Sequence, residues 1–493
     1  MALGQVASGP FVAGAARTVL NHGYLAAGRV SGALSMPVES YAVRVLPGTV
    51  GVQFLGATPG ALRAARVRLT VTEPDGLRLT VVPKVSTDGL AAWRPAGGWT
   101  RGRWSLSLGS PVLGYARWTV TIPAQVGAAP RSAITPDGQS ALEILNGARA
   151  SMDLPSVRWA ARLAEASGWH ASYLGRYGTT HPSFHVEEAG AGFTGRMPWD
   201  RDLAAGWPDG DTGEVGMSAP TVHPGGTVIA ALLDTVYHRL ALLAAKLTTM
   251  GFAAAAGSQT AAAIANLGYG YPSTLRLAVA YPAPGQVGVP RAWLDNESPD
   301  PVPHGTGGVY GYPVTLDFPT VDRLGPTSMA LIGPGGPTAT WVDAPGRGDM
   351  DQNQVALVPK RALRPDAWYT VVMRSPHAVF MDGTHGALAE HWRFRTAAAD
   401  QSVFVAAAAH RLVVAVDDAA SDVVAAGVPL RVSLAYRHSV RGGGVGWKRL
   451  TLHAVTGPDG LAVIRLPGSG GAPYTAHVTT QSGGQGVATW PST

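Results

Sequence analysis

The chain has one long stretch with helical periodicity, residues 140–256, and strand-like sequence on both sides of it. Apolar residues recur at helical spacing in residues 140–152 and in residues 156–173, and a third helix is expected at residues 227–235. In the second segment one helical stripe carries Trp159, Leu163, Ala166, His170 and Tyr173. A single helical region between strand-rich regions predicts a multidomain chain in which one domain holds the helices.

Length and composition support several domains. The chain has 493 residues, enough for about three or four domains. Its 63 glycines and 38 prolines are typical of β-modules joined by turns.

Cysteine is absent, which excludes a disulfide framework, a thiolate nucleophile and a cysteine-based zinc site. No apolar run is long enough to predict a transmembrane helix. Residues 1–31 do not predict a signal peptide, because Arg17 and His22 interrupt the apolar stretch and no basic region precedes it.

The region before the helices, residues 41–123, predicts an all-β domain with a basic balance. Between residues 41 and 120 there are ten Arg and Lys against three Asp and Glu, a net charge of +7. One interpretation is a surface that binds an anionic or glycan polymer through these charges and through Trp93, Trp99, Trp104 and Trp118. The favoured interpretation places the arginines on the solvated face and the tryptophans in the core. No nucleic-acid-binding module is recognisable, so we expect no nucleic-acid partner.

The region after the helices predicts two β-sandwiches. Residues 281–303 are rich in proline, and strand-like segments follow from residue 311 to residue 396. The segment Pro365 to Thr370, together with the Trp-x-Phe-x-Thr pattern that ends at Thr396, resembles the bacterial Ig-like domain of surface-layer proteins. That resemblance implies a spacer without an active site. Residues 401–480 contain a further series of strands and predict a second Ig-like β-sandwich.

A long irregular segment lies between the second and third expected helices, and loops of that size in compact domains are usually functional. It contains, in order, THPS, GFTG, PWDR, AAGW and GE, and YHR and MGF follow it. This ordered series resembles the CAP superfamily of cysteine-rich secretory, antigen 5 and pathogenesis-related 1 proteins, in its bacterial secreted branch. The resemblance implies a three-layer α-β-α sandwich with a cleft that carries two histidines and two acidic residues.

The resemblance also implies which residues lie in this cleft. The first histidine corresponds to His181, the first acid to Glu214 and the second histidine to His238. Ala230 occupies the position of the second acid, so the set is incomplete. Two imidazoles and one carboxylate suit zinc or another divalent metal, with an open position for water. The alternative is that these groups only hydrogen-bond to one another and hold the long loop in place.

Three further carboxylates are candidates to support this site. Asp234 lies one helical turn before His238, and Glu187 and Glu188 lie on the loop. His170 lies on the apolar stripe of its helix, so we expect a hydrogen-bonded core histidine there. The remaining histidines of the loop, at positions 185 and 223, are expected at the surface.

Three functional hypotheses follow from the sequence. The leading one is a non-enzymatic extracellular or cell-surface protein whose CAP-like domain binds a small apolar ligand, a divalent metal or a partner, with β-domains as spacers or anchors. The second is a zinc-dependent hydrolase of cell-wall polymer. The third is a structural protein that self-assembles through β-domain edges. The expected domains are residues 1–130 (all-β), 136–280 (CAP-like), 281–398 (Ig-like) and 400–493 (Ig-like).

Overall fold

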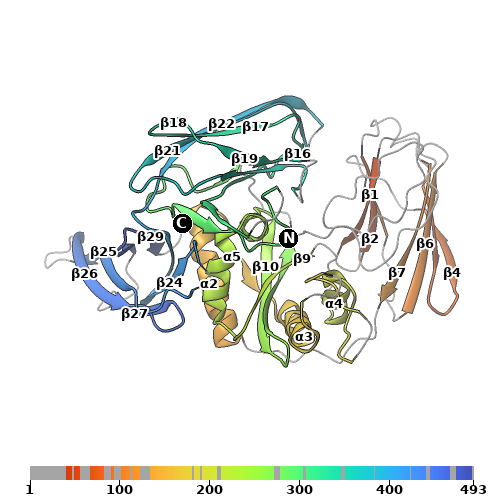
Figure 1. The fold of residues 1–493 in the computed structure, drawn as a ribbon. Coiled ribbons are helices and arrows are strands. Elements are labelled where there is room, and N and C mark those ends of the chain that lie inside the picture. The colour runs from red at the N-terminus through yellow and green to blue at the C-terminus, as the bar shows by residue number, and fades with distance from the viewer. Residues whose placement is uncertain are drawn as a thin grey trace.

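The computed structural model describes residues 40–46, 49–55, 67–82, 90–93, 102–110, 114–122, 134–179, 183–188, 191–207, 212–270, 278–303, 307–345, 350–381, 383–421, 423–439, 445–466 and 473–490. An all-β N-terminal domain (residues 40–122) precedes a helical domain (residues 134–270). Two β-sandwiches follow, which we call the first sandwich (residues 278–397) and the C-terminal sandwich (residues 401–490). Figure 1 shows the helices between these β-rich parts. The expected architecture, a helix-containing domain flanked by all-β domains, is confirmed.

The N-terminal domain has two antiparallel sheets, with strand orders β1-β2-β5 and β4-β3-β6-β7. Its strands are β1 (Ser40–Leu46), β2 (Thr49–Leu55), β3 (Arg68–Thr72), β4 (Arg78–Val81), β5 (Leu90–Trp93), β6 (Gly102–Ser110) and β7 (Gly114–Ile122). Val71, Trp104 and Leu106 are buried in the second sheet, whereas Arg68 and Arg78 are exposed. At these positions the arginines lie on the solvated face and the tryptophan lies in the core. The other three tryptophans of this region lie outside the described side chains.

The helical domain has a four-stranded sheet with the order β8-β10-β11-β9. Its elements are α2 (Pro136–Ser151), β8 (Arg158–Trp159), α3 (Ala161–Tyr177), α4 (Pro198–Ala204), β9 (Thr212–Ala219), α5 (Gly225–Asp234), α6 (Tyr237–Leu242), β10 (Leu247–Ala256) and β11 (Ala261–Tyr269). In Figure 1, α3 covers one face of the sheet and α2 with α5 covers the other. The three-layer α-β-α sandwich is therefore confirmed.

Close contact between α3 and the sheet depends on a glycine. A Cβ atom at Gly251 of β10 would lie 1.9 Å from the backbone nitrogen of Ala164 in α3. No side chain fits in that space, so the absence of one lets the helix backbone approach the strand. The apolar stripe of α3 lies against this surface, with Leu163, Ala166 and Tyr173 buried. The stripe predicted from helical spacing is thus the face that α3 packs on the sheet.

Two helices begin at residues other than those expected. α2 begins at Pro136, before the expected start at residue 140, because the Thr135 side chain accepts a hydrogen bond from the N–H of Gly138. α3 begins at Ala161 instead of residue 156, because the two residues of β8 pair in parallel with β10. Backbone groups that are paired in a sheet are unavailable to the first turn of a helix.

The first sandwich is built from three groups of strands. The sheet orders are β12-β15-β20-β19, β16-β21-β17-β18 with β22 on β21, and β13-β14. The strands are β12 (Val279–Tyr281), β13 (Ala292–Leu294), β14 (Val309–Gly311), β15 (Val314–Asp317), β16 (Val321–Arg323), β17 (Ser328–Gly333), β18 (Gly336–Pro337), β19 (Thr340–Asp343), β20 (Gln354–Pro359), β21 (Trp368–Phe380) and β22 (His385–Arg395). Because β12 pairs with β15, the expected boundary at residue 280 falls inside a strand of this sandwich.

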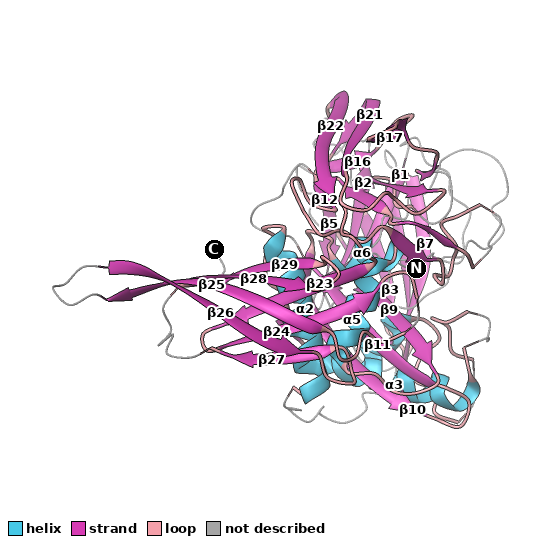
Figure 2. Cartoon of the chain, turned by 60° about the vertical axis from the view of Figure 1, so that its left-hand side comes forward, coloured by secondary structure: helices cyan, strands magenta, loops and turns pink. Residues whose placement is uncertain are grey.

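The C-terminal sandwich has two antiparallel sheets, ordered β23-β24-β27 and β26-β25-β28-β29. Its strands are β23 (Gln401–Ala408), β24 (Arg411–Asp418), β25 (Pro429–Ser439), β26 (Val445–Val455), β27 (Leu461–Arg465), β28 (Tyr474–Thr480) and β29 (Gln485–Trp490). Figure 2 shows the long β25–β26 hairpin extending beyond the body of the molecule. The first of the two sheets faces the helical domain, since α2 contacts β23 and α5 contacts β24.

One apolar core runs through the helical domain and the first sandwich, and side chains of the C-terminal sandwich join it. This cluster includes Ile144 of α2, Leu316 of β15 and Phe404 of β23. Polar contacts cross the same boundaries: the Ser402 hydroxyl donates to Asp234 at 2.7 Å, and the Thr227 hydroxyl donates to the Asp459 carbonyl at 2.5 Å. The three domains are therefore packed against one another as parts of a continuous core.

Arg239 joins the helical domain to the first sandwich. Its guanidinium lies over the rings of Tyr281 and Tyr312, 4.5 and 4.9 Å from their centroids. It also donates to the carbonyl of Pro313 at 2.9 Å and to that of Asp234 at 3.0 Å. The side chain is fully buried, and these contacts replace the water that an arginine requires.

A helix that spans a bilayer needs about 20 consecutive, mostly apolar residues. Within the described ranges, none of the helices is long and apolar enough to cross a membrane.

Candidate functional site

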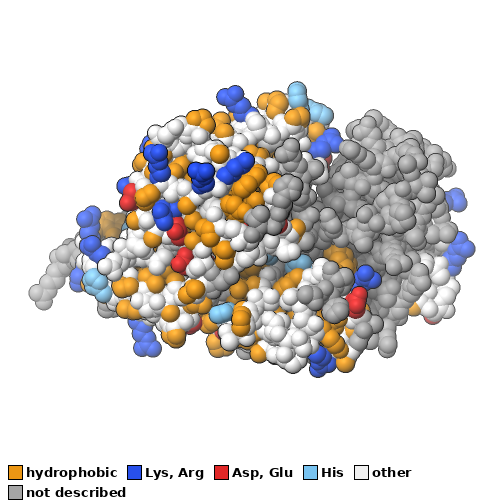
Figure 3. Space-filling view, in the orientation of Figure 1, with side chains coloured by type: hydrophobic (Ala, Val, Ile, Leu, Met, Phe, Trp, Pro, Cys, Tyr) orange, Lys and Arg blue, Asp and Glu red, His pale blue; other side chains and the backbone are white. Residues whose placement is uncertain are grey.

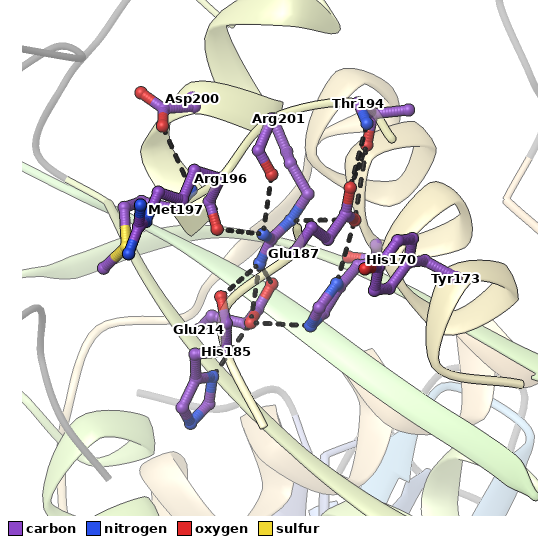
Figure 4. A network of polar contacts seen from close by, with 12 residues as sticks. His170, Tyr173, His185, Glu187, Thr194, Arg196, Met197, Asp200, Arg201 and Glu214 are labelled. Carbon is purple, nitrogen blue, oxygen red and sulfur yellow. Dashed lines mark hydrogen bonds and ion pairs between the residues drawn. The ribbon is translucent and has the colours of Figure 1, made fainter. Parts of the chain in front are cut away.

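The loop after α3 returns to the sheet and carries most of a buried polar network (Figure 4). His170 comes from α3, Glu187 from the loop, Arg201 from α4 and Glu214 from β9. All four side chains are almost completely buried, and His185 of the loop lies at their edge. Charged and polar groups at this depth need partners, so the contacts between them decide how the loop is held.

His170 and Glu187 fix the loop to α3. The ring of His170 lies between two oxygen atoms, with Nδ1 3.0 Å from Glu187 Oε1 and Nε2 2.9 Å from the carbonyl oxygen of Phe184. Glu187 also accepts a hydrogen bond from the backbone N–H of Thr194 at 2.9 Å. His170 is thus the hydrogen-bonded core histidine that its place on the apolar stripe predicts. Its contacts are structural, since both ring nitrogens are engaged.

Arg201 and Glu214 form the charged centre of the network. Nη2 of Arg201 lies 2.8 and 3.0 Å from the two carboxylate oxygens of Glu214. Burial would raise the pKa of Glu214, but the charge of Arg201, with His170 and His185, outweighs it and holds the pKa well below its usual range. Glu214 is therefore a carboxylate at neutral pH, and its Oε1 lies 2.9 Å from Nδ1 of His185.

A second histidine–carboxylate pair lies at the start of α6. Nδ1 of His238 is 2.8 Å from Oε1 of Glu297, a residue between β13 and β14 of the first sandwich. The same carboxylate accepts hydrogen bonds from the backbone N–H groups of Val236, Tyr237 and His238 at 2.7, 2.8 and 3.0 Å. Those donors are the unpaired N–H groups of a helix start, so Glu297 caps α6 from another domain.

The electrostatics of this pair define the state of His238. Burial would raise the pKa of Glu297, but His238 and the backbone N–H groups lower it to about 2. Burial lowers the pKa of His238 to about 4, against the attraction of Glu297. At neutral pH a neutral imidazole therefore faces an ionised carboxylate, and the proton must be on Nδ1 to donate. The lone pair of His238 is consequently on Nε2.

His185 has the same arrangement. Burial lowers the pKa of His185 although Glu214 opposes the shift, so its ring is neutral and its Nδ1–H donates to Glu214. Nε2 of neither histidine has a hydrogen-bond partner within the described ranges, and both side chains keep about a tenth of their surface, 11% and 9%, exposed. The two rings are near enough that positive charge on His185 lowers the pKa of His238. The site thus presents two oriented imidazoles with lone pairs at the surface.

The site residues predicted from the sequence are only partly brought together. His181 lies outside the described residues, so its assignment stays a prediction. Glu214 and His238 each belong to a histidine–carboxylate pair, but to different ones. Glu187 joins the network through His170, as a structural group. The prediction that His185 lies at the loop surface is wrong, because its ring is packed beside Glu214.

Two of the candidate supporting acids are corrected by the structure. Asp234 does not share a helix with His238, because α5 ends at Asp234 and α6 begins at Tyr237. Its carboxylate accepts hydrogen bonds from the hydroxyls of Tyr312 and Ser402 instead. Glu188 is exposed, and only its backbone contacts Tyr173.

Glu297 is the residue that sequence reasoning missed. The position expected to hold the second acid is Ala230, which is fully buried in α5. The carboxylate that orients His238 comes instead from Glu297, in the proline-rich segment 281–303. Its only signal in the sequence is an acidic residue in a proline-rich stretch, which marks no site by itself.

The donor set fits a divalent metal only in part. Two neutral imidazoles with free Nε2 lone pairs, each held by a carboxylate, match the way proteins orient histidine ligands. Within the described ranges, however, no group of three or more His, Cys, Asp or Glu side chains is placed to hold a metal ion. Among the described residues, these two imidazoles are therefore the candidate ligands.

Comparison with known proteins identifies a family for the helical domain. The family model of the cysteine-rich secretory protein family, CAP, matches residues 142–267. No curated protein matches the chain. Among solved structures, an extracellular Bacillus anthracis protein that contains an SCP domain is 15% identical; the match covers 48% of this chain and 68% of that chain, with a TM-score of 0.21.

Other solved structures match the chain more broadly but with low similarity. A run of titin domains is 8% identical, covers 94% of this chain and 96% of that chain, and has a TM-score of 0.16. A tandem repeat from the extending region of a large adhesion protein is 9% identical. That match covers 94% of this chain and 73% of that chain, with a TM-score of 0.13. Scores this low carry no argument, so the family rests on the sequence match and on the observed fold. Residues 142–267 are a CAP domain, a member of the cysteine-rich secretory protein family, set within a larger multidomain chain.

Proposed function

We propose that this chain is an extracellular or cell-surface binding protein, and that its CAP domain holds an exchangeable divalent metal, zinc in the first instance, between His185 and His238. The observation that supports this proposal is the state of the two rings. In each histidine, Nδ1 contacts a buried carboxylate and Nε2 has no described hydrogen-bond partner. Membership of a secretory protein family supports the location.

The two carboxylates give the proposal its chemical basis. Glu214 and Glu297 are ionised, so each fixes the tautomer of its histidine and increases the basicity of the Nε2 lone pair. Bound zinc would supply a Lewis-acid centre that accepts an oxygen atom of a ligand. Two histidines from the described ranges would fill only part of the coordination sphere of the metal. The remaining coordination positions would stay open for the bound molecule. A binding role is favoured over hydrolysis, because Glu214 already accepts hydrogen bonds from Arg201 and Glu297 from backbone N–H groups, so neither carboxylate is placed as a general base for zinc-bound water.

Zinc titration by isothermal calorimetry tests this proposal. The native chain should bind zinc, and His185→Gln or His238→Gln should each weaken binding about tenfold or more, because each removes one ligand. Glu297→Gln should weaken binding by a similar factor while leaving both ligands in place. His391→Gln, at an exposed position on β22, is the matched control and should bind zinc as the native chain does.

Two outcomes would overturn the proposal. One is the absence of zinc binding by the native chain at neutral pH. The other is unchanged binding by the double variant His185→Gln/His238→Gln. A further variant, His181→Gln, tests the assignment made from the sequence: a loss as large as that of His185→Gln would add His181 to the ligands.

A further inference from the structure

The second sheet of the C-terminal sandwich has one face toward the sandwich core and one toward solvent. Even-numbered residues such as Val432, Leu434 and Val478 are buried in the core cluster of this sandwich. Odd-numbered residues of β25, β26, β28 and β29 point the other way, because side chains alternate along a strand. We call the odd-numbered positions of these strands the outer face. The other sheet separates it from the helical domain, since β23 and β24 contact the helices.

Described side chains on the outer face are basic or neutral, and none is acidic. β26 contributes a continuous exposed row, and the other strands add exposed residues to the same face: Trp447, Arg449, Thr451, His453 and Val455 on β26, Arg431 on β25, His477 on β28, and Gln485, Val487 and Thr489 on β29. The register places Arg431 directly beside His453. Outward positions along β26 are about 6.8 Å apart, twice the rise of one strand residue.

The charge of this part of the chain is one-sided. Residues 429–493 contain six Arg and Lys and a single acid, Asp459, which gives a net charge of +5. That acid lies outside the outer face, in the turn before β27 whose backbone contacts Thr227 of the helical domain. In Figure 3, Lys, Arg and His side chains gather at the end of the molecule where Figure 1 places β25 and β26.

We propose that the outer face binds a linear anionic glycan whose units carry carboxylate or phosphate groups. Guanidinium groups such as those of Arg431 and Arg449 form paired hydrogen bonds with such oxyanions. Trp447 is 64% exposed and offers an aromatic surface to the apolar side of a sugar ring, and Thr451 lies two outward positions further along β26. The row along β26 suits an extended polymer, because repeated charges meet successive outward positions. The proposal is independent of the zinc site.

Binding of the full chain to immobilised polygalacturonate, a carboxylated glycan, and to phosphomannan, a phosphorylated one, tests this proposal. Neutral dextran and a DNA duplex serve as comparisons. The native chain should bind at least one of the two anionic glycans. The glycan that binds more tightly shows whether the outer face prefers carboxylate or phosphate groups. Dextran should not bind. Arg431→Glu/Arg449→Glu should weaken binding about tenfold or more, because attraction becomes repulsion at two positions.

A charge-matched variant separates the outer face from overall charge. Arg158→Glu/Arg361→Glu changes the net charge by the same amount at exposed positions of the other domains and should bind the glycans as the native chain does. Circular dichroism checks folding, and Arg431→Gln/Arg449→Gln repeats the test with a milder change. The proposal is overturned if the outer-face variants bind within about twofold of native, if the charge-matched variant loses as much, or if DNA binds as tightly as the glycans.

Discussion

At the scale of single residues, the site depends on carboxylates that hold histidines in one tautomer. Glu214 does this for His185 from within the CAP domain, and Glu297 does it for His238 from the first sandwich. Ala230, at the position where the family resemblance implies an acid, is buried among apolar side chains of α5. The carboxylate that contacts His238 thus comes from another domain.

His238 should make stability depend on pH. Its pKa is about 4 in the folded chain and about 6.5 when exposed, so between these values the unfolded chain binds a proton that the folded chain does not. The free energy of unfolding should therefore fall as the pH is lowered from 6.5 toward 4, by up to about 1.4 kcal/mol per pH unit for this residue. Urea unfolding of the native chain and of His238→Gln, between pH 4.5 and 6.5, measures the difference.

Glutamine keeps a donor toward Glu297 but takes up no proton, so the variant should show the shallower pH dependence. His185 is present in both proteins, and burial lowers its pKa in the same direction in each. Equal slopes for the two proteins would contradict the prediction.

At the scale of elements, α2 is packed between the sheet and the C-terminal sandwich. A Cβ atom at Gly147 of α2 would lie 2.3 Å from the backbone carbonyl oxygen of Val405 in β23. A rigid strand backbone cannot move aside as a flexible side chain can, so the contact between α2 and β23 requires glycine. Gly168 of α3 is the matched control, because a Cβ atom there would have only the Cβ of Ala253 within 4 Å, at 3.6 Å.

The same substitution should therefore have opposite effects in the two helices. Gly147→Ala should destabilise the chain by about 1–3 kcal/mol, because the added methyl group overpacks the interface. Gly168→Ala should stabilise it by about 0.5–1 kcal/mol, because alanine favours a helix more than glycine does. Urea unfolding of both variants beside the native chain measures the two changes. A stabilising effect of Gly147→Ala would mean that α2 and β23 are not in close contact.

At the scale of the whole molecule, three domains share one core. Side chains of α2, β15 and β23 belong to the same apolar cluster, and Arg239 and Glu297 join the CAP domain to the first sandwich. Domains connected by flexible linkers usually unfold separately, whereas domains that share a buried core lose stability together.

Hydrogen exchange in increasing urea should show this cooperation. Amides of β10 in the CAP domain, β20 in the first sandwich and β24 in the C-terminal sandwich should lose protection at the same urea concentration. Peptides are followed by mass spectrometry, and the N-terminal domain provides an internal comparison. Loss of protection in β24 at clearly lower urea than in β10 would show that the C-terminal sandwich unfolds by itself.

Much of the fold and part of the site follow from the sequence alone. Periodicity and glycine–proline spacing indicate which segments are helices and which are strands, because amphipathic patterns depend on neighbours in the chain. The stripe ending at Tyr173 is the packed face of α3, and the ordered motifs around Glu214 and His238 identify the CAP domain. These signals are local, so they can be read without knowing the fold.

The partners of the site were decided only by the tertiary structure. Glu297 is 59 residues from His238 and lies in a different domain, so no local pattern connects them. The burial of His185 beside Glu214 depends on how the loop crosses β9, and the start of α3 depends on pairing between β8 and β10. Hydrogen bonds and burial are set by distances in space, and the chain must fold before those distances exist.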